Sequence, residues 1–132
     1  MKERSRAHLY VSAATHAGMR GKNNEDRYGV TAFRMGKGSE PASALLAVLC
    51  DGIGGHRAGE VAAEIAVETI LKTMAKSDGF QPLSALREAI QQASQSVFVQ
   101  AQAKDSQRGM AATCACALVI ENRLYTASVG DS

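Results

Sequence analysis

The feature that most constrains the fold is an apolar run that leads through a glycine-rich turn into a helical pattern. Residues Ala44–Cys50 form a continuous apolar stretch without a polar residue, which is typical of a strand buried on both faces. Four glycines follow within residues 51–59. Apolar residues then recur at helical spacing over about Gly59–Ala75. Because glycine lets the backbone pass close to a neighbour or turn a carbonyl toward a ligand, we expect a sharp strand-to-helix turn here.

The rest of the chain places further strands on both sides of two helices. We expect strands at Leu9–Thr15 and Arg27–Arg34, from their apolar and alternating patterns. A second helix starts near Pro82, a favourable residue in a first helical turn. Residues Thr113–Ile120 and Arg123–Val129 then read as a hairpin. Strands, two helices and strands in this order indicate an α+β layered fold rather than strict βαβ alternation.

Composition excludes several classes of protein. The 132 residues suffice for one domain or part of one, with 45% apolar and 21% charged residues as in ordinary globular proteins. A net charge of +2 is too weak and too scattered for a nucleic-acid-binding surface. The sequence contains neither an apolar stretch of membrane-spanning length nor a secretory signal pattern, so we expect a cytoplasmic protein without a membrane partner in this segment.

The three cysteines, Cys50, Cys114 and Cys116, lie within apolar, strand-like runs. We expect free, buried thiols in a reducing cytoplasm. A Cys-x-Cys pair without a nearby histidine or a second pair is weak evidence for zinc.

Acidic residues occur in three turns next to predicted strand ends. Glu25 and Asp26 precede the second strand, Asp51 follows the third, and Asp131 follows the last. Each turn alone also fits a simple structural role, as an Asx-type turn or a helix cap. Carboxylates brought together repel one another unless a cation neutralises them, and Mg²⁺ and Mn²⁺ prefer oxygen ligands. Convergence of these turns would therefore require a metal.

A phosphate-binding loop is the main alternative for the glycine-rich turn. Gly52 and Gly54 fit the first two positions of the dinucleotide fingerprint, but Arg57 occupies the third. No Gly-Lys-Ser/Thr sequence follows either. Asp51 at the mouth of the loop would repel a phosphate and attract a metal, which leaves a nucleotide-binding α/β domain as the weaker alternative.

The cations Arg20 and Lys22 precede the first acidic turn. They fit either a phosphate dianion held near Glu25 or an ordinary solvated loop. His56 likewise fits either a proton donor to a leaving group or a histidine bonded to backbone.

Four motifs together resemble the opening motifs of the metal-dependent (PPM, type 2C) protein serine/threonine phosphatases in their bacterial form. The resemblance runs from about residue 9 to the last residue, and the first two motifs are strongly specific as a pair at this spacing. The motifs are Asn24-Glu25-Asp26, Asp51-Gly52-x-Gly54-Gly55-x-x-x-Gly59-Glu60, Gly109-Met110-Ala111-Ala112-Thr113 and Val129-Gly130-Asp131-Ser132.

The resemblance implies a β-sandwich of two antiparallel sheets flanked by helices, with a centre of two Mg²⁺ or Mn²⁺ ions and a third, weaker one. It implies that residues 1–8 are an N-terminal tail and residues 9–132 the N-terminal portion of the phosphatase domain, truncated at its C-terminus. The family completes its metal site with aspartates from a C-terminal half that is absent from this sequence. We therefore expect this fragment to be inactive by itself.

The resemblance also implies roles for individual residues. Asp51 bridges both metals, while the Gly52 carbonyl and Glu25 help to hold one of them. Asp26 orients a metal-bound water, and Asp131 faces the region of the third metal. Thr113 is implied to be a packing residue beside the site.

The family places a phosphate-holding arginine five residues before the aspartate of Asn-Glu-Asp. That position is Gly21 here, so Arg20 is the candidate phosphate ligand only if the loop carries one extra residue. The implied reaction is hydrolysis of phosphoserine and phosphothreonine in proteins, often the targets of a partner kinase. A non-catalytic half-domain or pseudophosphatase that binds partners remains an alternative.

Overall fold

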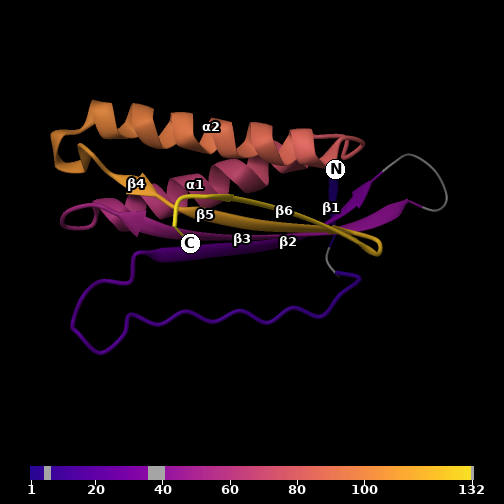
Figure 1. Cartoon of the computed structure of the whole chain (residues 1–132), viewed down its shortest axis with the longest axis horizontal. Coiled ribbons are helices and arrows are strands. Elements are labelled where there is room, and N and C mark those ends of the chain that lie inside the picture. Colours follow the sequence, from indigo (N-terminus) through magenta and orange to yellow (C-terminus); the bar gives the residue numbers. More distant parts are fainter. Residues whose placement is uncertain (5–6, 36–40, 132) are drawn as a thin grey trace.

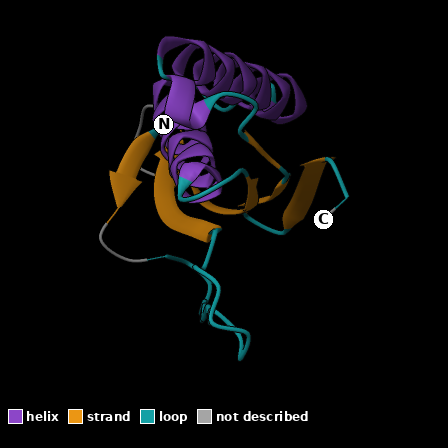
Figure 2. Ribbon diagram, turned by 90° about the vertical axis from the view of Figure 1, so that its left-hand side faces the viewer, coloured by secondary structure: helices purple, strands orange, loops and turns teal. Residues whose placement is uncertain are grey.

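The computed structural model describes residues 1–4, 7–35 and 41–131 and has two layers. One antiparallel sheet carries two helices on one of its faces, and a long loop runs past the other face (Figures 1 and 2). This arrangement confirms the α+β expectation, and the described residues form one sheet. The elements are β1 (Lys2–Arg4), β2 (Asp26–Met35), β3 (Ala42–Ile53), α1 (Ala58–Lys76), α2 (Pro82–Ala103), the 3-10 turn η1 (Asp105–Gln107), β4 (Ala111–Ala112), β5 (Cys114–Ile120) and β6 (Arg123–Val129).

The strand order across the sheet is β1-β2-β3-β5-β6, and the short β4 pairs with the end of β3. Strands β5 and β6 form the hairpin expected from the sequence, with Ile120 opposite Arg123. Glu121 in the two-residue turn has a positive φ of 52°. All pairings are antiparallel. β3, which precedes the helices, pairs directly with β5, which follows them.

Strand β3 is longer than the apolar run that predicted it. Ten residues of β3 pair with β2, from Met35 opposite Ala42 to Asp26 opposite Asp51. Asp51 and Gly52 were expected in the turn after the strand, and this boundary was wrong because both residues still pair within the sheet. Backbone pairing with β2 and β4 extends the strand beyond the residues whose side chains are apolar.

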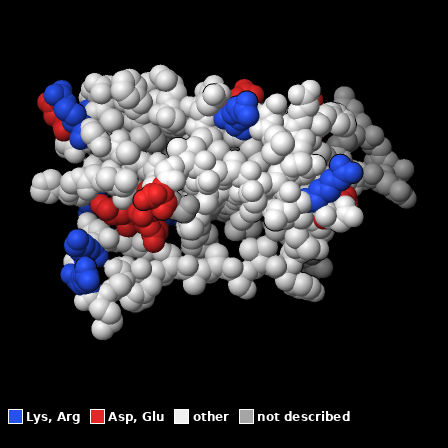
Figure 3. All heavy atoms as spheres, in the orientation of Figure 1, with Lys and Arg blue, Asp and Glu red and all other residues white. Residues whose placement is uncertain are grey.

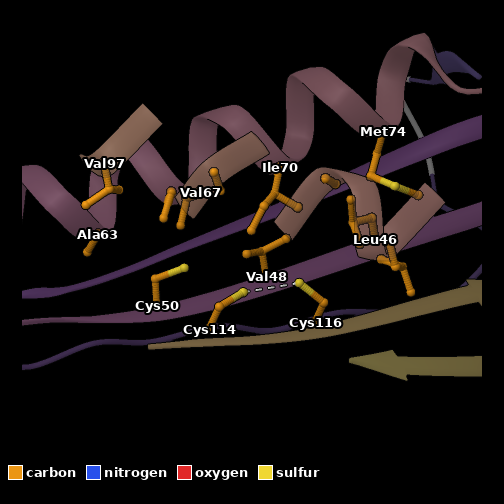
Figure 4. Packing of buried hydrophobic residues seen from close by; sticks show 14 of the residues in the cluster. Leu46, Val48, Cys50, Ala63, Val67, Ile70, Met74, Val97, Cys114 and Cys116 are labelled. Carbon is orange, nitrogen blue, oxygen red and sulfur yellow. Dashed lines mark hydrogen bonds between the residues drawn. The ribbon is translucent and has the colours of Figure 1, made fainter. Parts of the chain in front are cut away.

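The core lies between the helices and one face of the sheet (Figure 4). Small side chains on the inner face of α1 let the helix approach the strands closely. Along the apolar stripe of α2, Leu86, Ala93, Val97 and Ala101 are buried and Ile90 is half-buried, whereas Leu83 at its start is 60% exposed. The largest fully buried side chains are Phe33, Leu46, Ile70, Met74, Leu86, Leu118 and Cys50.

The opposite face of the sheet is only partly covered. Ala44–Cys50 was expected to be buried on both faces, but Leu49 is 50% exposed. Since side chains of a strand alternate between faces and both helices pack on one face, the outward residues of β3 lack a second layer among the described residues. Leu45 is the exception, because residues 7–11 line a groove together with it.

The strand expected at Leu9–Thr15 was wrong. This segment has no ladder pairing in the described chain, and it passes along the open face of β2 and β3 as a loop (Figure 1). Residues Lys2–Arg4, expected as a solvated tail, instead form β1 on the edge of β2, with Lys2 opposite Arg34. An alternating or apolar pattern favours an extended backbone, but a strand also needs a free edge to pair with.

No helix among the described residues is long and apolar enough to cross a membrane.

Candidate metal centre

The acidic turns predicted from the sequence lie at one end of the sheet. Asp26 begins β2, Asp51 lies near the end of β3, and Asp131 follows Gly130 at the end of β6. Because β2, β3, β5 and β6 are antiparallel neighbours, these three positions belong to the same edge of the molecule. Figure 3 shows acidic side chains gathered at this end, beside the start of β2 and the C-terminal label of Figure 1.

Asp26 and Asp51 are directly opposite residues of β2 and β3. The backbone of each is held by a short local network. The Asp26 amide donates to Asn24 Oδ1 at 3.0 Å, and the Asp51 carbonyl accepts from the Thr113 amide at 2.8 Å. The Asp51 amide in turn donates to Thr113 Oγ1 at 3.3 Å. Thr113 therefore lies beside Asp51 and orients its backbone, while the Asp51 side chain remains exposed.

The glycine-rich turn brings the end of β3 against the start of α1. A Cβ at Gly52 would lie 1.9 Å from the Gly59 carbonyl oxygen, and a Cβ at Gly54 would lie 2.7 Å from the Gly59 nitrogen. The close neighbour of the turn is therefore the first turn of the helix itself.

Glu25 lies over the contact between strand and helix. Its carbonyl accepts a hydrogen bond from the Gly52 amide at 3.1 Å. A Cβ at Gly59 would lie 2.8 Å from both the Cδ and Oε1 atoms of Glu25. Gly59 therefore leaves the room that the Glu25 carboxylate occupies.

Arg27 is a residue of this end of the sheet that sequence reasoning missed. Its guanidinium forms an ion pair with Glu60 in the first turn of α1. The same guanidinium donates to the carbonyls of Asn24, at 3.0 Å, and Asp26, at 2.7 Å. Arg27 thus ties the Asn-Glu-Asp segment to the helix. The available signal was an arginine directly after that motif and a glutamate closing the second motif.

Two other candidate residues lie away from these contacts. Arg20 is exposed in the loop between Gly18 and Gly21, which have φ values of 78° and 68°, and it makes no hydrogen bond or ion pair with a described residue. His56 is exposed in the turn before α1, with a positive φ of 50°.

The donors at this end match the chemistry of a hard divalent cation in part. Two opposed carboxylates, the Glu25 carboxylate and the Gly52 carbonyl are oxygen donors of the kind that Mg²⁺ and Mn²⁺ prefer. Within residues 1–4, 7–35 and 41–131, however, no group of three or more acidic, histidine or cysteine side chains is close enough to hold a metal ion. The described residues therefore supply oxygen donors of the right kind but not a complete ion-binding group.

The cysteines lie on the face of β3 and β5 that packs against the helices. As expected, Cys50, Cys114 and Cys116 are free and buried. The Cys114 and Cys116 sulfur atoms are 3.4 Å apart. Hydrogen bonds from the neighbouring thiols of Cys116 and Cys50 lower the pKa of Cys114. The matching bonds to Cys114, with burial, raise the pKa values of Cys50 and Cys116.

Comparison with known proteins assigns the family. The family model described as Protein phosphatase 2C matches residues 15–132. The chain belongs to the protein phosphatase 2C family. Its members include the protein phosphatase 2C-type protein of Streptococcus pyogenes, which is 33% identical over 128 residues, 94% of this chain and 48% of the relative. The chain thus spans about half the length of that relative.

Solved structures of this phosphatase family share the fold. The serine/threonine phosphatase Stp1 from Staphylococcus aureus matches with a TM-score of 0.71 and 33% identity, over 89% of this chain and 45% of that one. The catalytic domain of the phosphatase PstP, solved in complex with two manganese ions, matches with a TM-score of 0.60 and 25% identity, over 80% of this chain and 48% of that one. The resemblance read from the four motifs is thereby confirmed at the level of the family and its fold.

Proposed function

We propose that this protein phosphatase 2C chain forms the N-terminal part of an enzyme that hydrolyses phosphoserine and phosphothreonine in proteins. The observation that carries the proposal is the direct opposition of Asp26 and Asp51 at the acidic end of the sheet. Two opposed carboxylates are destabilising unless a cation lies between or beside them. A relative of similar fold, PstP, binds two manganese ions.

In this proposal Asp51 would be a ligand shared by two Mg²⁺ or Mn²⁺ ions, and the Gly52 carbonyl and Glu25 would be further donors to one of them. Gly52 packs closely against Gly59, and the Glu25 carboxylate also lies against Gly59. Asp131, which follows β6 at the same end, faces a third and weaker ion. The remaining metal ligands would come from residues other than these four.

The cations, when bound, lower the pKa of water and balance the charge of the phosphoryl group. Asp26 accepts a hydrogen bond from the attacking water and orients it toward the phosphorus. The Arg27 guanidinium, bonded to the Asp26 carbonyl, holds that residue in place. Arg20 binds the phosphate dianion from its exposed loop, which must then close toward the acidic end.

The proposed substrates are proteins phosphorylated by a serine/threonine kinase. The three free cysteines favour a reducing compartment, and we propose a cytoplasmic location. A pseudophosphatase is the second candidate, because the described donors do not include a group of three. It would bind Mn²⁺ weakly and show no turnover.

The test measures phosphate release from a phosphothreonine peptide by the full-length protein, with and without Mn²⁺. Asp51→Asn should reduce metal-dependent turnover by more than about 100-fold, because loss of a direct metal ligand should exceed the roughly 10–100-fold effect of residues that only support the ligands. Glu64→Gln, which removes one exposed carboxylate of α1, is the matched control and should retain full activity. Activity that survives Asp51→Asn would refute the bridging role, and wild-type protein without turnover would favour the pseudophosphatase.

A further inference from the structure

All three cysteines of the chain lie beneath α1, on the face of the sheet that packs against the helices. Figure 4 shows Cys114 of β5 between Cys50 of β3 and Cys116 of β5, under Val67 and Ile70. Each cysteine is at most 5% exposed. The proposed hydrolysis uses none of these thiols, so their clustering calls for a separate explanation.

The strand register places Cys50 directly opposite Cys114. Leu49 pairs with Ala115, and the Thr113 amide donates to the Asp51 carbonyl, so the pair between them joins Cys50 and Cys114. Since Thr113 and Asp51 form a hydrogen-bonded pair, the next pair along the ladder is of the non-hydrogen-bonded kind. In such pairs the Cα atoms are about 4.5 Å apart, which falls within the range of about 4.4–6.8 Å found across disulfides.

The pair within β5 is less suited to a disulfide, although its sulfur atoms are 3.4 Å apart. Cys114 and Cys116 are two residues apart in one strand, and a strand rises about 3.4 Å per residue. Their Cβ atoms are therefore separated by much more than the roughly 3.5–4.5 Å that a disulfide requires. Oxidation should join Cys114 to its partner across the ladder.

A cavity gives a small oxidant access to Cys114. It has a volume of about 330 Å³ and lies between α2, α1 and the start of β5, with Cys114 in its wall. Phe98 and Val129, which also line it, are 59% and 49% exposed, so the cavity reaches the surface. A water molecule occupies about 30 Å³ in the liquid, and a peroxide molecule is small enough to enter.

We propose that Cys50 and Cys114 form a redox site in which a peroxide converts the two thiols to a disulfide across β3 and β5. The Cys114 sulfur attacks one peroxide oxygen, the O–O bond breaks, and a sulfenic acid and one water form. The Cys50 sulfur then attacks the Cys114 sulfur, the S–O bond breaks, and a second water leaves with the thiol proton. Two thiols and one peroxide thus yield one disulfide and two waters, and a thiol reductant reverses the change.

The disulfide would act on the metal centre through its position in the sheet, a consequence that rests on the proposed function. Cys50 directly precedes Asp51, and Cys114 directly follows Thr113, whose amide and hydroxyl hold the Asp51 backbone. Pulling the two strands into disulfide geometry changes the surroundings of Asp51. We expect oxidation to weaken Mn²⁺ binding by about 10-fold, the lower end of the range for changes in groups that orient the metal ligands.

The test treats the reduced full-length protein with hydrogen peroxide, alkylates the remaining thiols and digests it with trypsin without a reductant. Cleavage at the basic residues puts Cys50 in peptide 38–57 and both other cysteines of this chain in peptide 109–123. We expect these two peptides to be cross-linked, with Cys116 alkylated, and to separate on reduction. A disulfide confined to peptide 109–123, or thiols that remain free in the folded protein, would overturn the proposal.

Single variants assign the pair. Cys116→Ala removes an equally buried thiol from the same face and should leave the cross-link intact, whereas Cys50→Ala and Cys114→Ala should abolish it. If those two fail to fold, the wild-type peptide map still decides the pairing. Calorimetric titration with Mn²⁺ before and after oxidation tests the coupling, and unchanged affinity would overturn it. A cross-link in a protein that binds no Mn²⁺ when reduced would refute the proposed function alone.

Discussion

Asp26 and Asp51 are paired directly across β2 and β3, at the end of the sheet where the acidic side chains gather. Like charges in directly opposed positions of a sheet destabilise it. We therefore expect a cation bound beside this pair to stabilise this end of the molecule.

The first prediction concerns this charge pair in the metal-free protein. Asp26→Asn removes one of the opposed charges and should raise the free energy of unfolding by about 0.5 kcal/mol, while it lowers the affinity for Mn²⁺. Urea unfolding in a chelator and calorimetric titration with Mn²⁺ measure the two effects. Glu64→Gln, an exposed carboxylate on α1, should change neither quantity. A parallel loss of stability and affinity in Asp26→Asn would contradict repulsion between the pair.

The second prediction concerns the contact of β3 with α1. Gly52→Ala would put a Cβ 1.9 Å from the Gly59 carbonyl oxygen, and backbone atoms there have little room to move. We expect a loss of about 1–3 kcal/mol or more in stability, as for other overpacked sites. Gly55→Ala in the same turn is the control, since nothing lies within 4 Å of its added Cβ. Equal melting temperatures for the two variants would show that the strand and helix do not approach this closely.

The third prediction concerns Arg27, which joins the start of β2 to α1 through Glu60 and two backbone carbonyls. Arg27→Met keeps much of the side-chain volume but removes these bonds, and we expect it to cost about 1.5–3 kcal/mol, the range for hydrogen bonds of charged groups. Mn²⁺ affinity should fall as well, because the Asn24–Asp26 segment loses its support. Lys72→Met, which breaks only the exposed ion pair with Glu68, should cost less than about 0.5 kcal/mol. Chemical denaturation of both variants distinguishes the two roles.

The fourth prediction concerns the open face of the sheet. Tyr28, Val30 and Leu49 are 43%, 38% and 50% exposed on neighbouring positions of β2 and β3. A contiguous exposed apolar surface favours association. Residues 1–132 produced alone should therefore associate in light scattering coupled to size exclusion, and Leu49→Thr should shift the distribution toward monomer. A monodisperse wild-type monomer with cooperative unfolding would show that this face needs no cover.

Much of the secondary structure followed from local patterns. The helical spacing of apolar residues predicted α1, a first-turn proline indicated the start of α2, and the two runs Thr113–Ile120 and Arg123–Val129 predicted the β5–β6 hairpin. The strand expected at Leu9–Thr15 failed because its pattern says that the backbone is extended but not whether an edge is free to pair with it. The edge of β2 pairs with Lys2–Arg4 instead, a basic segment without any apolar signal.

The candidate site was predicted as a set of residues and not as an arrangement. The motifs singled out Glu25, Asp26, Asp51 and Gly52, but they did not indicate that the first turn of α1 packs directly against the glycine-rich turn. Arg27 escaped notice since its partners come from both its own segment and a helix more than thirty residues away in sequence.

The sequence by itself determined the two helices, the strands β2, β3, β5 and β6, the family and the residue types at the acidic end, because these depend on short-range periodicity and on motifs contiguous in the chain. Only the tertiary structure decided that Asp26 faces Asp51, that Glu25 rests on Gly59, and that Cys50 lies opposite Cys114. Each of these relationships depends on the register between segments distant in sequence. A shift of one residue would turn every side chain of a strand to the other face, so packing of the whole core selects the register.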